Sequence, residues 1–272
     1  MLNVTEKVLC VACLPEEKFI HYIYAAEQAG ITALSMWMAA YYKARKEGHS
    51  DDEILALLKA RNLRIEMLEA VANWPSASLE KIEARARPIL ELGSTFNISS
   101  ICAVSYSDAV ESPSSASKKL AYLSDLAAEY KIKVAVEMLP FGGITSFDLA
   151  SEIVLGADRD NAGFLIDSWH WYRTGADCNT LRKLPAERIF NIQISDAPLQ
   201  AEDDPLAECM ARRLLPGEGV VPIQAMLQTF ADMGVSCSVG LEVLSDKLKQ
   251  RSATEVVRSL GKGLDNVLAE LA

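Results

Sequence analysis

The sequence predicts a (β/α)8 barrel that forms one domain over residues 1–272. Short apolar runs alternate with helical patterns along the chain, and this alternation requires right-handed crossovers and a parallel sheet. The length of 272 residues is close to the roughly 250 that such barrels use. An open doubly wound sheet shares the alternation, but a glycine-rich turn follows its first strand, and this chain reads LPEEKF there. The closed barrel is therefore favoured.

The first half of the chain supplies four expected strands, which are short apolar runs over residues 8–14, 31–36, 63–71 and 98–104. The helices expected between them cover residues 15–29, 39–47 and 51–60, and a longer one runs from Ser76 or Ser78 toward Leu92. Proline suits the first turn of a helix, serine its N-cap, and glycine the position after its end. On this basis Pro15 opens the first helix, Ser50 caps the third, and Gly93 ends the fourth.

The second half supplies four more expected strands, over residues 134–137, 164–166, 189–195 and 237–242. The expected helices cover residues 113–130, 146–155 and 222–233, and the last runs from Ala253 to the C-terminus. Residues 139–145 contain a proline and two glycines, a composition typical of a flexible loop. Residues 197–219 are polar and weakly patterned, and a loop of this length is usually functional or disordered.

The charge of the chain indicates a small-molecule partner. A net charge of −10 and a pI near 4.9 provide no basic surface for nucleic acid or for an anionic membrane. No run approaches the roughly 18 apolar residues of a membrane span, and the apolar run near the N-terminus is too short for a targeting signal. We therefore expect a cytoplasmic protein that binds neither nucleic acid nor membrane.

The six cysteines are expected to be reduced, because a core of this size needs no disulfides and most of them lie in apolar, strand-like runs. Cys10 and Cys13 form a CxxC pair, which redox enzymes place at the start of a helix. Here the pair lies in an expected strand, where residues three apart point to opposite faces. A redox pair is therefore disfavoured.

The stretch GFLIDSWHWYR, residues 163–173, changes from a buried apolar run to side chains that can take part in catalysis. Asp167 stands at the end of the expected strand, and His170 follows three residues later. The carboxyl ends of strands are where parallel α/β folds build their sites. The alternative is structural: Asp167 caps the next turn, and His170 packs between Trp169 and Trp171.

Oxygen-bearing side chains occur at four consecutive strand ends: Glu137, Asp167, Gln193 and Glu242. A barrel brings these ends to one mouth. Each residue alone is equally consistent with a solvated turn, but three carboxylates close together repel one another unless a cation is present. An all-oxygen set suits Mn²⁺ or Mg²⁺ better than zinc, with Co²⁺ also compatible. Such an ion would polarise a substrate carbonyl.

Five motifs carry a resemblance to a known family: VEMLP with Glu137, IDSWH with Asp167 and His170, IQISDAP with Gln193, RLLPGEG with Arg213, and GLEVLSD with Glu242. At these residues the chain resembles the xylose isomerase-like TIM barrels. This superfamily contains sugar phosphate isomerases and epimerases, 3-dehydroshikimate dehydratases and the endonuclease IV type of repair enzyme. The resemblance covers most of the chain and is sharpest from the fifth expected strand onward.

The resemblance implies that Glu137, Asp167, Gln193 and Glu242 bind the metal. Many epimerases of the family have histidine where this chain has Gln193, whereas some dehydroshikimate dehydratases have glutamine followed by a similar acidic segment. The endonuclease type is disfavoured, because its metal site is rich in histidine and this acidic chain has only 3 histidines.

The resemblance also assigns catalytic and substrate-binding roles. Glu137 and Glu242 would act as an acid and base pair on opposite sides of the substrate. His170 would contact a substrate oxygen or carry a proton, and Arg213 would hold a hydroxyl or carboxylate group. Trp37 and Trp169 are expected to line the substrate pocket, although aromatic side chains near strand ends equally serve as packing at the rim of a barrel.

The expected activity is a metal-dependent sugar or sugar phosphate isomerase or epimerase, which removes a proton next to a metal-bound carbonyl of a small polyhydroxylated substrate. The first alternative is a metal-dependent dehydratase of the 3-dehydroshikimate type, which begins with the same proton abstraction. A sugar-binding barrel without turnover is the third reading, and the complete set of ligands argues against it. Barrels of this family often dimerise, so a homodimer is expected.

Overall fold

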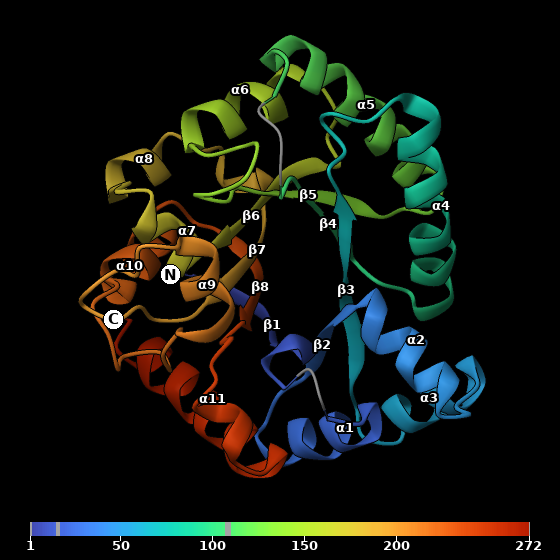
Figure 1. Ribbon diagram of the computed structural model, residues 1–272, viewed down its shortest axis with the longest axis vertical. Coiled ribbons are helices and arrows are strands. Elements are labelled where there is room, and N and C mark those ends of the chain that lie inside the picture. The colour runs from blue at the N-terminus through green and yellow to red at the C-terminus, as the bar shows by residue number, and fades with distance from the viewer. Residues whose placement is uncertain (1, 15–16, 107–109, 272) are drawn as a thin grey trace.

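The computed structural model describes residues 2–14, 17–106 and 110–271. Within these residues, parallel strands close into a barrel of eight, in which each strand pairs with the next and the eighth pairs with the first. Figure 1 shows the helices arranged around the outside of the strands. None of the described helices has the length and apolar character needed to span a membrane. The predicted barrel is confirmed.

The strands are β1 (Asn3–Cys10), β2 (Ala33–Trp37), β3 (Arg64–Ala72), β4 (Ser100–Val104), β5 (Lys133–Glu137), β6 (Ala162–Asp167), β7 (Ile189–Ile194) and β8 (Ser236–Leu241). The α-helices are α1 (Phe19–Gln28), α2 (Met38–Lys46), α3 (Asp51–Lys59), α4 (Leu79–Phe96), α5 (Pro113–Ala128), α6 (Phe147–Gly156), α7 (Ser168–Arg173), α8 (Cys178–Arg182), α9 (Pro205–Ala211), α10 (Ile223–Asp232) and α11 (Ala253–Ala269). Short 3-10 helices are η1 (Val11–Cys13), η2 (Ala186–Arg188) and η3 (Leu248–Gln250).

The prediction for the first strand was wrong in position, because the apolar run marks a buried turn as well as a strand. β1 begins at Asn3, which pairs with Ser236 of β8, although the first five residues of the strand are exposed or only partly buried. Residues 11–14 leave the strand: Val11–Cys13 form η1, Leu14 is its C-cap, and the single hydroxyl proton of buried Tyr22 is shared between the carbonyls of Val11 and Leu14. Burial alone therefore does not define this strand.

The predicted helix boundaries agree with the structure at Ser50, which forms a capping box with Glu53, and at Ser78, which caps α4. The prediction that Gly93 ends α4 was wrong, because the helix continues to Phe96 and ends at Asn97 with φ of 52°. A Cβ at residue 93 would lie 2.6 Å from Cδ1 of Ile98, so this glycine serves close packing. Pro15 lies outside the described residues. The expected loop 197–219 contains α9.

The alternation of side chains along the strands positions the site. A large apolar core lies between the sheet and the helices, and a smaller cluster packs on the inner face of the strands. That inner cluster includes Met67, Ala135 and Leu165. Because strand side chains alternate between faces, the acidic residue two positions after each of these also points into the barrel. The inner face thus changes from apolar to acidic toward the carboxyl ends of the strands.

Candidate active site

A cavity of about 270 Å³ opens at the carboxyl ends of the strands. Its polar walls are Glu69, Glu137, His170, Arg213 and Glu242. Its other lining residues are aromatic, apolar or cysteine side chains, which include Trp37, Tyr106, Phe141, Leu206, Cys209 and Met210. A mostly apolar pocket with a few converging charged groups is typical of a small-molecule site.

The structure brings the four predicted metal ligands to this end of the barrel. Glu137 and Asp167 are the last residues of β5 and β6, and Asp167 is directly opposite Gln193 in the register of β6 and β7. Glu242 follows the last residue of β8. All four side chains belong to residues that are at most 8% exposed. Glu137 and Glu242 line the cavity, while Asp167 and Gln193 are buried beside it.

Arg213 lies among these acids, fully buried. Its Nη1 donates hydrogen bonds to Oδ2 of Asp167 at 2.9 Å and to Oε2 of Glu242 at 3.2 Å. Its Nε donates to the carbonyl of Cys209 at 3.0 Å, which holds the guanidinium in place. Arg213 was predicted to bind substrate. It lines the cavity, and it is also the charge partner of two predicted metal ligands, which the sequence reasoning did not foresee.

His170 is held as a neutral imidazole. Burial lowers the pKa of His170 to about 4. Its Nε2 lies 3.4 Å from Oε1 of Glu137 and 3.4 Å from Nη2 of Arg213. A guanidinium only donates hydrogen bonds, so Nε2 accepts from Arg213 in the tautomer protonated on Nδ1 and donates to Glu137 in the tautomer protonated on Nε2. Nδ1 has no partner among the described residues.

Both readings of the stretch around Asp167 describe real features of the structure. Asp167 is the N-cap of α7, and its Oδ1 accepts a hydrogen bond from the backbone N–H of His170 at 2.9 Å. The His170 ring packs edge-on against Trp169, with 5.2 Å between the ring centroids. This structural role fixes the direction of the imidazole, and Oδ2 of Asp167 remains directed toward Arg213.

The carboxyl groups of the cavity hold protons more tightly than ordinary glutamates. Burial, together with the charge of Asp167, raises the pKa of Glu137 to about 7. Burial also raises the pKa of Glu242 to about 8; the charge of Arg213 opposes this rise, and the charges of Glu69, Glu137 and Asp167 add to it. One guanidinium therefore compensates the cluster only in part, and a divalent cation would compensate it further.

Glu69, near the end of β3, belongs to the same cluster and was missed in the sequence analysis. Burial raises the pKa of Glu69 to about 7. Its Oε1 accepts a hydrogen bond from Ser35, and its Oε2 accepts one from the indole N–H of Trp37. A charged residue near the end of an apolar strand is the same signal that identified Glu137, so the pattern in residues 63–71 contained the information needed.

The described residues fit a divalent cation. Ligand atoms of Glu137, Asp167 and His170 all lie within 4.8 Å of one another, and so do those of Cys10, Glu69 and Glu242. The Oε1 atom of Gln193 is buried and has no hydrogen-bond partner among the described residues. An unpaired buried acceptor is costly, so a cation beside Gln193 would satisfy it. Glu137 and Asp167 belong to one of these groups and Glu242 to the other, and their carboxylates, with this amide oxygen, are the hard donors that Mn²⁺ and Mg²⁺ prefer.

The two predicted tryptophans occupy different places. Trp37 lines the cavity and donates its indole N–H to Oε2 of Glu69 at 3.1 Å. Trp169 is fully buried, and its indole N–H donates to Oε1 of Glu208 at 3.0 Å. The guanidinium of Arg213 lies over its ring, 5.4 Å from the centroid. Trp169 thus packs against Arg213 and His170 and is not part of the cavity wall.

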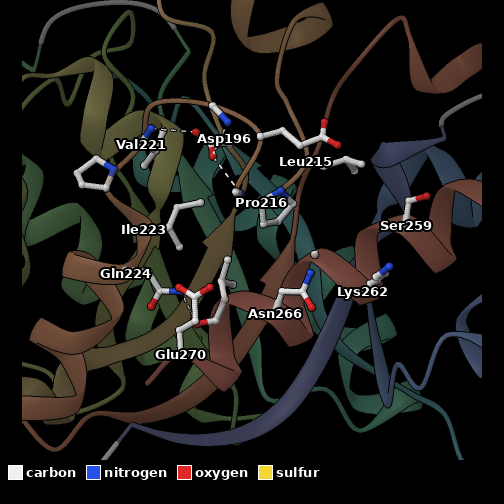
Figure 2. A pocket seen from close by; sticks show the side chains of 16 residues that line it. Asp196, Leu215, Pro216, Val221, Ile223, Gln224, Ser259, Lys262, Asn266 and Glu270 are labelled. Atoms are coloured by element: carbon white, nitrogen blue, oxygen red, sulfur yellow. Dashed lines mark hydrogen bonds between the residues drawn. The ribbon is translucent and has the colours of Figure 1, made fainter. Parts of the chain in front are cut away.

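A larger cavity of about 680 Å³ lies between the loop 215–223 and α11, away from the predicted site residues (Figure 2). The Asp196 carboxylate at its edge accepts hydrogen bonds from the backbone N–H groups of Gly217, Gly219 and Val221. Ser259, Lys262 and Asn266 of α11 form the facing wall. Asp196 therefore organises the turn that follows Arg213, and Glu218 in this turn is exposed to solvent.

Comparison with known proteins identifies the family. A family model described as xylose isomerase-like TIM barrel matches residues 23–263. The chain belongs to this family. The fold and the resemblance inferred from the motifs at the strand ends are thereby confirmed.

Similar proteins include enzymes of two classes. An inosose isomerase from Bacillus licheniformis is 34% identical over 143 residues, which are 52% of this chain and 50% of that protein. A 3-dehydroshikimate dehydratase from Pseudomonas aeruginosa is 29% identical over 188 residues, 67% of this chain and 29% of that protein. The matched region thus spans about half the length of that isomerase and less of the dehydratase.

Among solved structures, the IolI protein with a bound zinc atom superposes with a TM-score of 0.89 at 21% identity, over 98% of this chain and 99% of that chain. At this identity the similarity shows the shared fold.

Proposed function

We propose that the protein is a divalent-metal-dependent isomerase or epimerase of a small polyhydroxylated carbonyl compound, either a sugar, a sugar phosphate or an inosose. The observation that carries this proposal is the placement of Glu137 and Glu242 in one cavity, on strand ends three places apart around the barrel. Two carboxyl groups on different sides of a substrate can remove a proton from one position and return one elsewhere. The similarity to inosose isomerases supports the same reaction class.

The cation would be held by Glu137, Asp167, Gln193 and Glu242, and it would act as a Lewis acid that polarises the substrate carbonyl. Mn²⁺ or Mg²⁺ suits this oxygen set best, and Co²⁺ is also compatible. The zinc atom named for the IolI structure supports a divalent ion in this fold.

The protein side chains provide the proton transfers. The pKa of Glu137, raised by burial to about 7, and that of Glu242, raised by burial to about 8, lie near neutral pH, where general acid–base catalysis is most effective. A bound cation would favour their ionised forms. Neutral His170, which lines the cavity, would contact a substrate oxygen. Nη2 of Arg213, beside the imidazole, would orient the same part of the substrate.

A dehydratase of the 3-dehydroshikimate type is the second candidate, supported by Gln193 and by similarity to the Pseudomonas enzyme. Elimination of water needs an acid directed at the β-hydroxyl, and His170 is the residue that we expect in this role. Because burial lowers the pKa of His170 to about 4, the ring carries no extra proton at neutral pH. This feature favours the isomerase.

Mass spectrometry of products formed in D₂O tests the choice between the two reactions. The metal-loaded protein is incubated with keto sugars, their phosphates, inososes and 3-dehydroshikimate. An isomerase or epimerase incorporates deuterium at carbon and conserves the atoms of the substrate. A product that has lost one water would show the dehydratase reaction, and no turnover of any substrate by the metal-loaded protein would contradict both assignments.

We also propose that the protein acts in the cytoplasm and forms a homodimer. All six cysteines are free, which suits a reducing compartment. Leu199, Leu206 and Met210, in the segment that contains α9, are between 42% and 80% exposed, and contact with a second copy would cover such apolar side chains. Sedimentation analysis gives the mass in solution, and a monomer at micromolar concentration would contradict the dimer.

A further inference from the structure

Glu69 is held in one position by donors from two other strands. It is 7% exposed and projects from β3 into the cavity. Its Oε1 accepts a hydrogen bond from Oγ of Ser35 at 2.5 Å and another from Nε2 of Gln193 at 3.5 Å. Its Oε2 accepts from Nε1 of Trp37 at 3.1 Å. Because both oxygens face donors, the carboxylate acts here as an acceptor.

The contact with Glu69 determines the orientation of the Gln193 amide. The NH₂ and oxygen ends of an amide are nearly equal in shape, so a rotation of about 180° exchanges them. A carboxylate repels the oxygen end and attracts the NH₂ end, so Nε2 faces Glu69. Oε1 is then directed away from Glu69, and it is the atom that is buried without a hydrogen-bond partner in the part of the chain that the structure describes. Only this oxygen can bind a cation.

We propose that Glu69 is a positioning residue, which fixes the amide of Gln193 with its oxygen directed to the cation site. This inference rests on the proposed function, because it requires that the site binds a divalent ion. Residues that hydrogen-bond to metal ligands orient them and tune the affinity of the site. Without Glu69, the amide would also adopt the reversed orientation, which places an NH₂ group against the cation.

A different role for Glu69 would be that of a direct ligand, since Cys10, Glu69 and Glu242 also form a compact group. The contacts favour the positioning role, because Ser35, Trp37 and Gln193 already use both carboxylate oxygens. In contrast, none of the described residues donates a hydrogen bond to Oε1 of Gln193. The two roles predict different results when Gln193 is removed.

The test is a double-mutant cycle in which Mn²⁺ binding to the metal-free protein is measured by titration calorimetry. Glu69→Gln is compared with the wild-type protein, and then again in a Gln193→Ala background. The wild-type protein should bind one ion per chain, and Glu69→Gln should bind Mn²⁺ with an affinity about tenfold to a hundredfold lower. In the Gln193→Ala background the same substitution should change the affinity by about threefold or less, because the residue on which Glu69 acts is absent.

A matched control is available in the same strand. Glu66 is also buried, at 5% exposure, and it contacts Arg64 and Ser99 instead of the site. Glu66→Gln should leave Mn²⁺ affinity within about twofold of the wild type. Thermal unfolding of each metal-free protein reports folding separately. If Glu69→Gln does not fold, Ser35→Ala replaces it in the double-mutant cycle, because this substitution removes a hydrogen-bond donor to Glu69. The expected loss of Mn²⁺ affinity is then smaller.

Each outcome decides a different claim. Equal losses in the two backgrounds would show that Glu69 acts by its charge or as a ligand, and would overturn the positioning role. Unchanged affinity in Glu69→Gln would overturn it as well. A wild-type protein that binds no Mn²⁺ would overturn the proposed function itself, and the positioning role with it.

Discussion

Nη1 of Arg213 lies 2.9 Å from Oδ2 of Asp167, and both side chains are almost completely buried. This pair places a permanent positive charge within a cluster that otherwise consists of acids. The same Nη1 reaches Glu242 at 3.2 Å, so one guanidinium links two of the four predicted metal ligands. Arg213 therefore stabilises the cluster when no metal is bound, in addition to the substrate contact predicted for it.

Substitution of Arg213 separates these two roles. Arg213→Ala should keep its metal, because removing a positive charge favours a cation nearby. The Michaelis constant for the substrate should rise by about tenfold or more, since a hydrogen bond to a charged group contributes about 1.5–3 kcal/mol. The metal-free variant should lose about 3–5 kcal/mol of stability, as expected when one partner of a buried ion pair is removed. Metal analysis, steady-state kinetics and urea unfolding measure these effects, and loss of the metal would argue against this assignment.

Asp167 combines a predicted metal contact with a helix cap, and two substitutions distinguish them. Asp167→Ala should abolish metal binding and activity, and it should also remove the cap of α7, which contributes about 1 kcal/mol. Asp167→Asn keeps a side-chain oxygen for the cap but loses the charge, so it should bind metal weakly and unfold at higher urea concentration than the alanine variant. Full metal affinity in either variant would contradict the ligand role.

The acid–base pair is tested by amide substitutions that keep the shape of the side chain. Glu137→Gln and Glu242→Gln should each lower kcat by about a hundredfold to ten thousandfold, the range for loss of a general acid or base. The variant that lacks the base should also lose exchange of the substrate proton with D₂O, as followed by NMR. If both variants exchange that proton at the wild-type rate, neither carboxyl group is the base.

The stability of the metal-free protein should fall as the pH rises from about 6.5 to 8. Burial raises the pKa of Glu137 to about 7 and that of Glu242 to about 8, above the ordinary value of 4.5, so the folded state binds these protons more tightly than the unfolded state. The contribution of these two groups to the stability of the folded protein is therefore complete below pH 4.5, and it is lost as the pH rises through 7–8. The pKa of His170 is lowered, so this residue has the opposite effect, but only below its ordinary pKa of 6.5.

The loss over this pH window should be on the order of 1–2 kcal/mol, which urea unfolding at several pH values resolves. Saturating Mn²⁺ should remove the decrease, because the cation stabilises the ionised carboxylates. Glu242→Gln supplies the matched control, in which the slope above pH 7 should be smaller. A metal-free protein that becomes more stable between pH 6.5 and 8 would contradict the assignment of these groups.

The sequence was sufficient to predict the barrel and the strand ends because both depend on local patterns. Apolar runs that end in an oxygen-bearing residue located Glu137, Asp167, Gln193 and Glu242 without any structure. Glu69 carried a similar signal but lies three residues before the end of β3, farther from its strand end than any of these four residues, and was therefore missed.

Other features depend on contacts between distant segments and could not be read from the chain. The ion pair of Arg213 with Asp167 joins residues 46 positions apart. Gly93 is a residue type that commonly follows the end of a helix, but here it allows close packing against Ile98 and Ile132. The apolar residues 11–14 satisfy the pattern of a strand, but in the structure they form a buried turn at the end of β1.

The metal content of the purified protein tests the central claim most directly. The protein is stripped with a chelator, dialysed, loaded with Mn²⁺ and passed through a desalting column before elemental analysis. We predict about one ion per chain, a higher thermal midpoint than that of the stripped protein, and activity that disappears with chelator and returns with Mn²⁺. Absence of bound metal after loading, together with a thermal midpoint that the chelator does not change, would contradict the account.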